Sequence, residues 1–210
     1  VRDILRAVDE VSDLARLSQN TLSGRLRIGV IPTIAPYLLP SFIGQLTHDH
    51  PTLDLQIRET LTPRLIEELA QGRIDVAIVA LPVSEPSFEE VEIFEENFVL
   101  IRPDIDADRA VPDAADLAKM KLLLLEEGHC FRDQALAFCS MRSPLQREGL
   151  DGSSLSTLVQ LVGAGIGVTL IPDMAVSVET RSANVSVARF KGVQPKRTIG
   201  MIWRKTSPLA

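Results

Sequence analysis

The sequence has 210 residues, 45% of them hydrophobic and 24% charged, a composition that excludes disordered, collagen-like and low-complexity chains. Charges, prolines or glycines interrupt every apolar stretch before the roughly 18 residues that span a bilayer, so we expect a cytoplasmic protein without membrane contact. The formal net charge of −6 argues against DNA binding by this chain itself, because phosphates require a positive face. Since the first residue is Val1 and not methionine, we expect a further N-terminal portion.

The first 22 residues are predicted to form a linker or dimerisation helix. Apolar residues recur at steps of three and four, at Val1, Ile4, Val8, Val11 and Ala15. This spacing is typical of a coiled-coil seam, and the remaining positions carry acids and bases in mixture. A helix packed on its own domain is the alternative.

From residue 23 onward, short β-rich runs alternate with helical patterns, which is typical of α/β folds with mostly parallel sheets. Strands are predicted at 26–31, 53–59, 75–81, 98–101, 122–125, 168–171, 185–189 and 198–203. Helices are predicted at 37–49, 63–71, 113–120, 132–141 and 154–163, the last one capped by Ser154.

This number of elements predicts two small Rossmann-like lobes of mostly parallel sheet flanked by helices, preceded by the linker helix. We assign residues 23–94 and 199–210 to the first lobe and 95–198 to the second. The cleft between such lobes is the usual place for a ligand. Six glutamates between residues 85 and 96 fall where the chain crosses between lobes, and we interpret this stretch as a solvated connector.

The segment 126–139, with the sequence EEGHCFRDQALAFC, follows a predicted strand and carries the candidate chemistry. Cys130 is expected at the N-terminal end of a helix, where unpaired backbone N–H groups and the macrodipole favour a thiolate. His129 and Arg132 add positive or donating groups beside it. Because the thiolate is the nucleophile, Cys130 is the candidate reactive sulfur and a peroxide is a suitable oxidant. An ordinary turn cysteine is the alternative.

Cys139 lies at the edge of an apolar helical stripe and is expected to be buried. Nine helical positions separate the two cysteines by about 13 Å, whereas a disulfide needs Cα atoms within about 7 Å. The spacing excludes a static bridge within one regular helix but permits a switch in which the segment refolds. Core thiols and a metal site remain alternatives, although Cys-x-x-Cys pairs are lacking.

No cofactor motif is recognised. The glycine-rich stretch 163–167 follows a predicted helix and precedes a strand, which is the wrong order for a dinucleotide-binding loop. We interpret it as a helix C-cap.

Several further motifs distinguish the chain. They are GRLRIG at 24–29, IPT at 31–33, PYLLP at 36–40, LAQGRIDVAI at 69–78, GIGVTLIP at 165–172 and RTIG at 197–200. With these motifs and the segment 128–139, nearly the whole chain resembles the effector-binding part of LysR-type transcriptional regulators. More narrowly, it is similar to the members of that family that sense hydrogen peroxide.

The resemblance implies that Cys130 is the peroxidatic cysteine and Cys139 the resolving one. It implies that a peroxide pocket is surrounded or supported by Thr33, Thr62, His129, Asp133 and Arg197. It also implies a periplasmic-binding-protein-like fold, a winged helix-turn-helix DNA-binding domain absent from this chain, and a homotetramer in the intact regulator. Hydrogen peroxide, promoter DNA and RNA polymerase are the implied partners, with no cofactor and no metal.

We therefore expect the redox-sensing regulatory domain of an activator of antioxidant genes, and not an enzyme. One alternative is an effector domain that binds a small metabolite between its lobes, with incidental cysteines. A thiol peroxidase that consumes peroxide catalytically is a second alternative.

Overall fold

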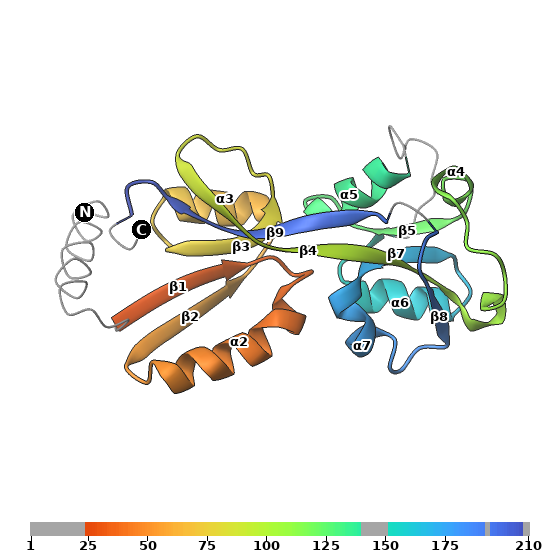
Figure 1. The fold of residues 1–210 in the computed structure, drawn as a ribbon, viewed down its shortest axis with the longest axis horizontal. Helices are drawn as coiled ribbons and strands as arrows, with labels where there is room; N and C mark the ends of the chain where they lie inside the picture. Colours follow the sequence, from red (N-terminus) through yellow and green to blue (C-terminus); the bar gives the residue numbers. More distant parts are fainter. Residues whose placement is uncertain (1–23, 140–150, 192–193, 208–210) are drawn as a thin grey trace. The chain divides into compact units, whose positions relative to one another are not determined.

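The computed structural model describes residues 24–139, 151–191 and 194–207, and the helix predicted for residues 1–22 lies outside them. The chain divides into two compact units, unit 1 (Val1–Ile93 and Ile199–Ala210) and unit 2 (Phe94–Thr198). Strands β4 (Phe88–Pro103) and β9 (Lys196–Arg204) contribute residues to both units (Figure 1).

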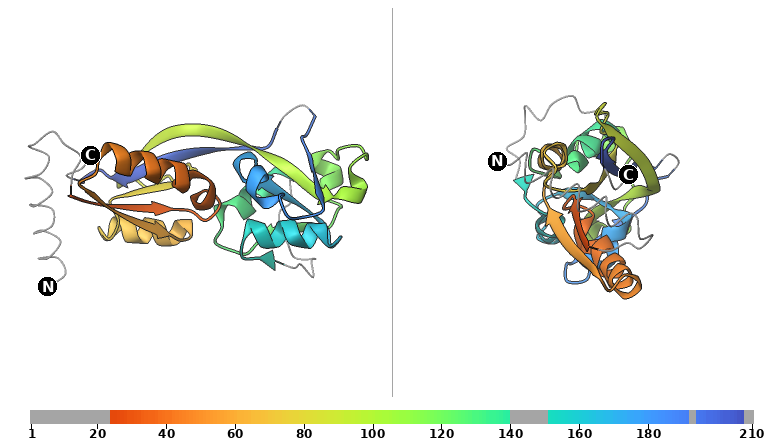
Figure 2. Two further views of the ribbon diagram at one scale, coloured as in Figure 1. Left: turned by 90° about the horizontal axis from the view of Figure 1, so that it is seen from below. Right: turned by 90° about the vertical axis from the view of Figure 1, so that its left-hand side faces the viewer.

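Unit 1 is an α/β layer whose strands follow the order β2-β1-β3-β9-β4. Strand β1 is parallel to both β2 and β3. Helices α2 and α3 lie on opposite faces of this sheet (Figure 1 and Figure 2). The elements are β1 (Gly24–Val30), α2 (Ala35–Asp49), β2 (Leu53–Glu59), α3 (Thr62–Ala70) and β3 (Val76–Leu81).

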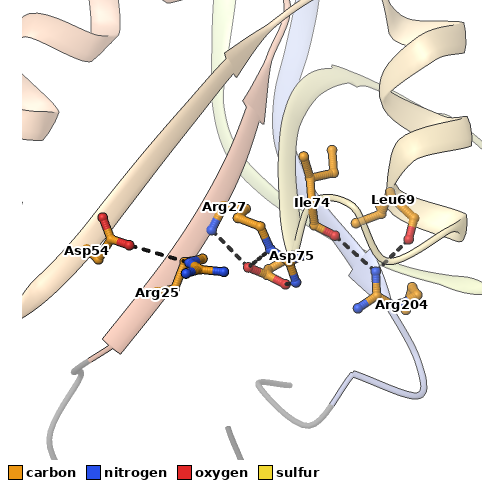
Figure 3. Close-up of polar contacts among 7 residues, drawn as sticks. All are labelled: Arg25, Arg27, Asp54, Leu69, Ile74, Asp75 and Arg204. Atoms are coloured by element: carbon orange, nitrogen blue, oxygen red, sulfur yellow. Dashed lines mark hydrogen bonds and ion pairs between the residues drawn. The ribbon is translucent and has the colours of Figure 1, made fainter. Parts of the chain in front are cut away.

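A buried carboxylate holds strands β1 and β3 of unit 1 together (Figure 3). Asp75 accepts hydrogen bonds from the backbone N–H of Arg27 at 2.8 Å and from its guanidinium at 2.7 and 3.1 Å. Arg204, near the end of β9, donates to the carbonyl oxygens of Leu69 and Ile74 beside it. These bonds satisfy the backbone of the α3–β3 turn and explain why the motif at 69–78 contains its aspartate.

Unit 2 is a second α/β layer with strand order β4-β7-β5-β6 and with β8 paired to β4. Strand β5 is parallel to β6 and β7, whereas β4 is antiparallel to β7 and β8. Helices α5 and α6 lie on opposite faces of this sheet (Figure 1). The principal elements are β5 (Leu122–Leu125), α5 (Cys130–Phe138), β6 (Asp151–Gly152), α6 (Leu155–Gly163), β7 (Val168–Pro172) and β8 (Val185–Ala188). Shorter elements are η1 (Asp104–Asp106), α4 (Ala114–Leu117), η2 (Asp173–Ala175) and α7 (Val176–Glu179).

Apolar runs form the central strands of both units. Every residue of β5 and β7 is buried, as expected for parallel strands covered by helices on both faces.

The predicted caps of α6 are confirmed. Ser154 Oγ accepts from the N–H of Thr157 at 3.1 Å, and the helix ends at Gly163. The N–H of Gly165 (φ 77°) bonds to Val162 O and that of Ile166 to Leu161 O, a Schellman motif rather than a nucleotide loop.

The structure corrects the interpretation of the glutamate-rich stretch as a solvated connector. Residues 88–103 form one long strand, β4, of which only 98–101 was predicted. Most of its glutamates are exposed or half-buried, but Glu96 is only 6% exposed. Pairing with β9, which is remote in sequence, overrides the low β-propensity of glutamate.

Among the described residues, no helix is long and apolar enough to cross a membrane.

Candidate redox site

Cys130 is the first residue of α5, directly after the turn that leaves β5. Gly128 makes this turn with a φ of 95°, a conformation that a side chain would strain. Cys130 is partly exposed, whereas Cys139 is buried. The sulfur therefore lies at a helix N-terminus, where the macrodipole stabilises an anion.

Cys139 immediately follows α5 and is buried, at 3% exposure. Its backbone N–H bonds to the carbonyl oxygen of Ala135, so it closes the last helical turn. No disulfide joins it to Cys130 in this structure. Nine helical positions correspond to about 13 Å along the axis. The structure thus holds the two cysteines in a dithiol state that cannot be bridged while α5 is intact.

His129 is the N-cap residue of α5, and it is 5% exposed. Burial lowers the pKa of its imidazole below the ordinary value of 6.5, and the charge of Glu126 opposes this effect in part. The imidazole is therefore neutral at pH 7. It can donate or accept a hydrogen bond beside Cys130, so of the positive or donating groups expected from the sequence His129 is a donating one.

Arg132 anchors α5 to the sheet. Its Nη1 donates to the carbonyl oxygen of Leu125 at 2.6 Å and forms an ion pair with Asp151 at 3.1 Å. Its side chain is 8% exposed. The guanidinium therefore links the first turn of α5 to the end of β5 and the start of β6, which gives it a structural role that the sequence did not indicate.

Arg197 is fully buried against the start of α5. Its guanidinium lies over the ring of Phe131, 5.4 Å from the ring centroid, and the Phe131 ring packs edge-on against Phe98. Both Nε and Nη2 contact the Glu96 Oε2, at 2.9 and 2.8 Å. The positive charge of Arg197 is therefore compensated by a carboxylate. Glu96 is a residue that sequence reasoning missed.

Asp133 and Gln134 occupy different environments on α5. Asp133 is exposed in the first turn, where a carboxylate stabilises the helix N-terminus. Gln134 lies one turn after Cys130, and its Oε1 is buried without a hydrogen-bond partner. Such an oxygen fits a bound polar molecule or a water. The only sequence signal for Gln134 is its position four residues after Cys130, about one helical turn along α5.

The two predicted threonines belong to unit 1. Strands β1 and β2 pair Val30 with Glu59, and Thr33 and Thr62 each lie three residues further along the chain. Both therefore follow the carboxyl ends of neighbouring parallel strands, the edge at which α/β sheets bind ligands. Thr33 is 2% exposed, and Thr62 Oγ1 is buried without a hydrogen-bond partner. That these threonines share a pocket with the cysteines of unit 2 stays a prediction.

The described residues contain no group of three or more metal-ligating side chains. His48 is exposed in the last turn of α2, and His50 caps that helix.

Comparison with known proteins identifies the family of the chain. Residues 19–210 match the family model of the LysR substrate binding domain. The chain belongs to the LysR family.

Two curated relatives show how much of a LysR-type protein the chain represents. It is 41% identical to a probable hydrogen peroxide-inducible genes activator of Mycobacterium leprae over 97% of this chain and 66% of the relative. It is 40% identical to the DNA-binding transcriptional dual regulator OxyR of Escherichia coli K12, over 99% of this chain and 69% of the relative. The chain thus spans about two thirds of the length of these relatives.

A solved LysR-type structure supports the fold. A cysteine-to-serine mutant of Corynebacterium glutamicum OxyR, with hydrogen peroxide bound, superposes with a TM-score of 0.88 at 33% identity. The match covers 98% of this chain and 66% of that one. Mostly parallel α/β units with flanking helices, expected from the sequence, are therefore confirmed.

Proposed function

We propose that this chain is the redox-sensing regulatory part of a LysR-type transcription activator, which responds to hydrogen peroxide through Cys130 and Cys139. The observation that carries the proposal is the placement of the two thiols at opposite ends of one helix. One is partly exposed at the helix N-terminus and the other is buried just beyond its last residue. The peroxide-related names of the relatives support the choice of oxidant.

The first chemical step is the attack of the Cys130 thiolate on one oxygen of hydrogen peroxide. An S–O bond forms, the O–O bond breaks, and the second oxygen leaves as hydroxide, which takes a proton to become water. Sulfur is oxidised by two electrons to a sulfenic acid, and the peroxide is reduced. The neutral imidazole of His129 and the amide of Gln134 are the described groups of α5 suited to hold the peroxide by hydrogen bonds.

The second step forms the switch. The Cys139 thiol attacks the Cys130 sulfenic sulfur, an S–S bond forms, and the hydroxyl group leaves as water. Because this bond is incompatible with an intact α5, disulfide formation is coupled to unwinding of the helix. A refolded segment at 128–142 then changes how subunits pack, and a DNA-binding domain outside this chain transmits the change to promoter DNA and RNA polymerase. In this proposal the peroxide is further supported by Asp133 and Arg197 of unit 2.

A trapping experiment tests the chemistry. The reduced Cys139→Ser variant is treated with hydrogen peroxide and a 1,3-dione reagent that captures sulfenic acids, and the adduct is located by mass spectrometry. We expect one adduct on Cys130, formed much faster than on a cysteine-containing peptide. The Cys130→Ser variant is the matched control, and we expect no comparable adduct in it. Equal adduct formation in the chain and the peptide would overturn the proposal and leave a ligand-binding effector domain.

A further inference from the structure

Two ion pairs lie next to each other on strands β4 and β9, and they have opposite environments. The side chains of Glu95 and Lys196 are more than half exposed, with a contact of 2.6 Å. One residue further along each strand, Glu96 and Arg197 have side-chain exposures of 4% and 0%. Successive side chains of a strand point to opposite faces, so the first pair faces solvent and the second faces the core of unit 2.

The carboxylate of Glu96 links three elements. Its Oε2 accepts from Nε and Nη2 of Arg197 on β9, while its Oε1 accepts the backbone N–H of Met174 at 3.1 Å in η2. The guanidinium of Arg197 therefore has a fixed orientation. It rests on the ring of Phe131, the residue that follows Cys130.

We propose that Glu96 is a positioning residue for the reaction of Cys130 with hydrogen peroxide, because it holds the buried guanidinium of Arg197 over Phe131 at the start of α5. This inference rests on the proposed function. The leaving oxygen of the peroxide gains negative charge as the O–O bond breaks, and a rigidly held cation stabilises such charge better than a mobile one. Glu96 contributes only by orienting Arg197.

A glutamine cannot replace Glu96 in this arrangement. Both oxygens of the carboxylate face donors, namely the guanidinium on one side and the N–H of Met174 on the other. An amide has one oxygen and one NH₂ group, so one donor would face another donor. Glu96→Gln therefore places a donor against Arg197 or Met174 and changes the orientation of the guanidinium.

The test measures two reactions of Cys130 in a Cys139→Ser background. We compare the rate constant for oxidation by hydrogen peroxide with that for alkylation by iodoacetamide, which needs the same thiolate but has no breaking O–O bond. For Glu96→Gln we expect peroxide oxidation to slow at least about tenfold and alkylation to change less than about threefold. Glu95→Gln, which removes the exposed pair on the same strands, is the matched control and should leave both rates unchanged.

A second variant keeps the proposal falsifiable if Glu96→Gln lowers stability. Because Glu96 acts through Arg197, the change Glu96→Gln should slow peroxide oxidation no further when Arg197→Met is already present. Additive effects of the two changes, or an equal loss of both reactions in Glu96→Gln, would overturn the positioning role. A parent chain whose Cys130 reacts with peroxide no faster than a peptide would instead refute the proposed function.

Discussion

Cys130 is the first residue of α5 and Cys139 is the residue that immediately follows it, so the whole helix separates the two thiols. Each cysteine is tied to a different end of the same structural element. In the proposed mechanism a disulfide between them requires α5 to unwind, so we expect the stability of α5 to determine how readily the sulfenic acid is captured.

The helical stability of α5 should control the second oxidation step. Ala137 is exposed in the last turn, so Ala137→Gly weakens the helix by about 1 kcal/mol without removing a packing contact. If unwinding precedes capture, disulfide formation from the sulfenic acid accelerates by about fivefold. Rapid-quench sampling at a high concentration of hydrogen peroxide measures this rate. Ala115→Gly, an exposed site in α4, is the control, and an equal rate in the parent and Ala137→Gly would exclude unwinding as a kinetic step.

The Arg132 guanidinium should matter for stability through its buried hydrogen bond to Leu125. Arg132→Met leaves that carbonyl oxygen without its charged donor, and we expect a loss of about 2–3 kcal/mol in the free energy of unfolding. Urea denaturation measures the change. Asp151→Asn, at a half-exposed carboxylate, should cost less than about 1 kcal/mol. The assignment would be wrong if the two variants were equally destabilised.

His129 should make the protein less stable in mild acid. Its folded-state pKa is lowered by burial, whereas the unfolded chain takes up a proton around pH 6.5. Between these values the unfolded state binds more protons, so stability present above pH 6.5 is lost as the pH falls toward the folded-state pKa. Urea denaturation at pH 7.5 and 5.5 should show a larger loss in the parent than in His129→Gln. His48→Gln, at an exposed histidine, should behave like the parent, and an unchanged pH dependence in His129→Gln would contradict this role.

The Arg27–Asp75 pair should stabilise unit 1 without affecting the thiol chemistry. Asp75→Asn replaces one oxygen of the carboxylate, which accepts three hydrogen bonds, with an NH₂ group. We expect a loss of about 2–3 kcal/mol in the free energy of unfolding. Asp54→Asn, which breaks an exposed pair with Arg25, should cost less than about 0.5 kcal/mol. The rate of Cys130 oxidation should be the same in both variants. A slower reaction in Asp75→Asn would show that this cluster influences the redox site.

Local sequence patterns were sufficient to predict the central strands and helices. Strands β2 and β5 have the predicted bounds because the apolar residues that define each strand lie within the strand itself. The position of Cys130 at a helix start and the burial of Cys139 followed from the same local reasoning. The N-terminal half of β4 was missed because its identity as a strand depends on pairing with β9.

The polar surroundings of the site could not be derived from the sequence. Glu96 and Arg197 are 101 residues apart, and Glu96 was one of six glutamates in a run that resembles a solvated surface. The neutral state of His129 likewise depends on burial by residues that fold over it. These properties are set by tertiary packing, which local periodicity does not record.

Peptide mapping after brief oxidation tests the central claim most directly. The reduced chain is exposed to one equivalent of hydrogen peroxide, alkylated and digested, with a cysteine-containing peptide as an internal reference for thiol reactivity. We predict that both thiols disappear together and that one disulfide-linked peptide containing Cys130 and Cys139 forms before the reference reacts. Survival of both thiols for as long as the reference thiol would contradict the sensor mechanism.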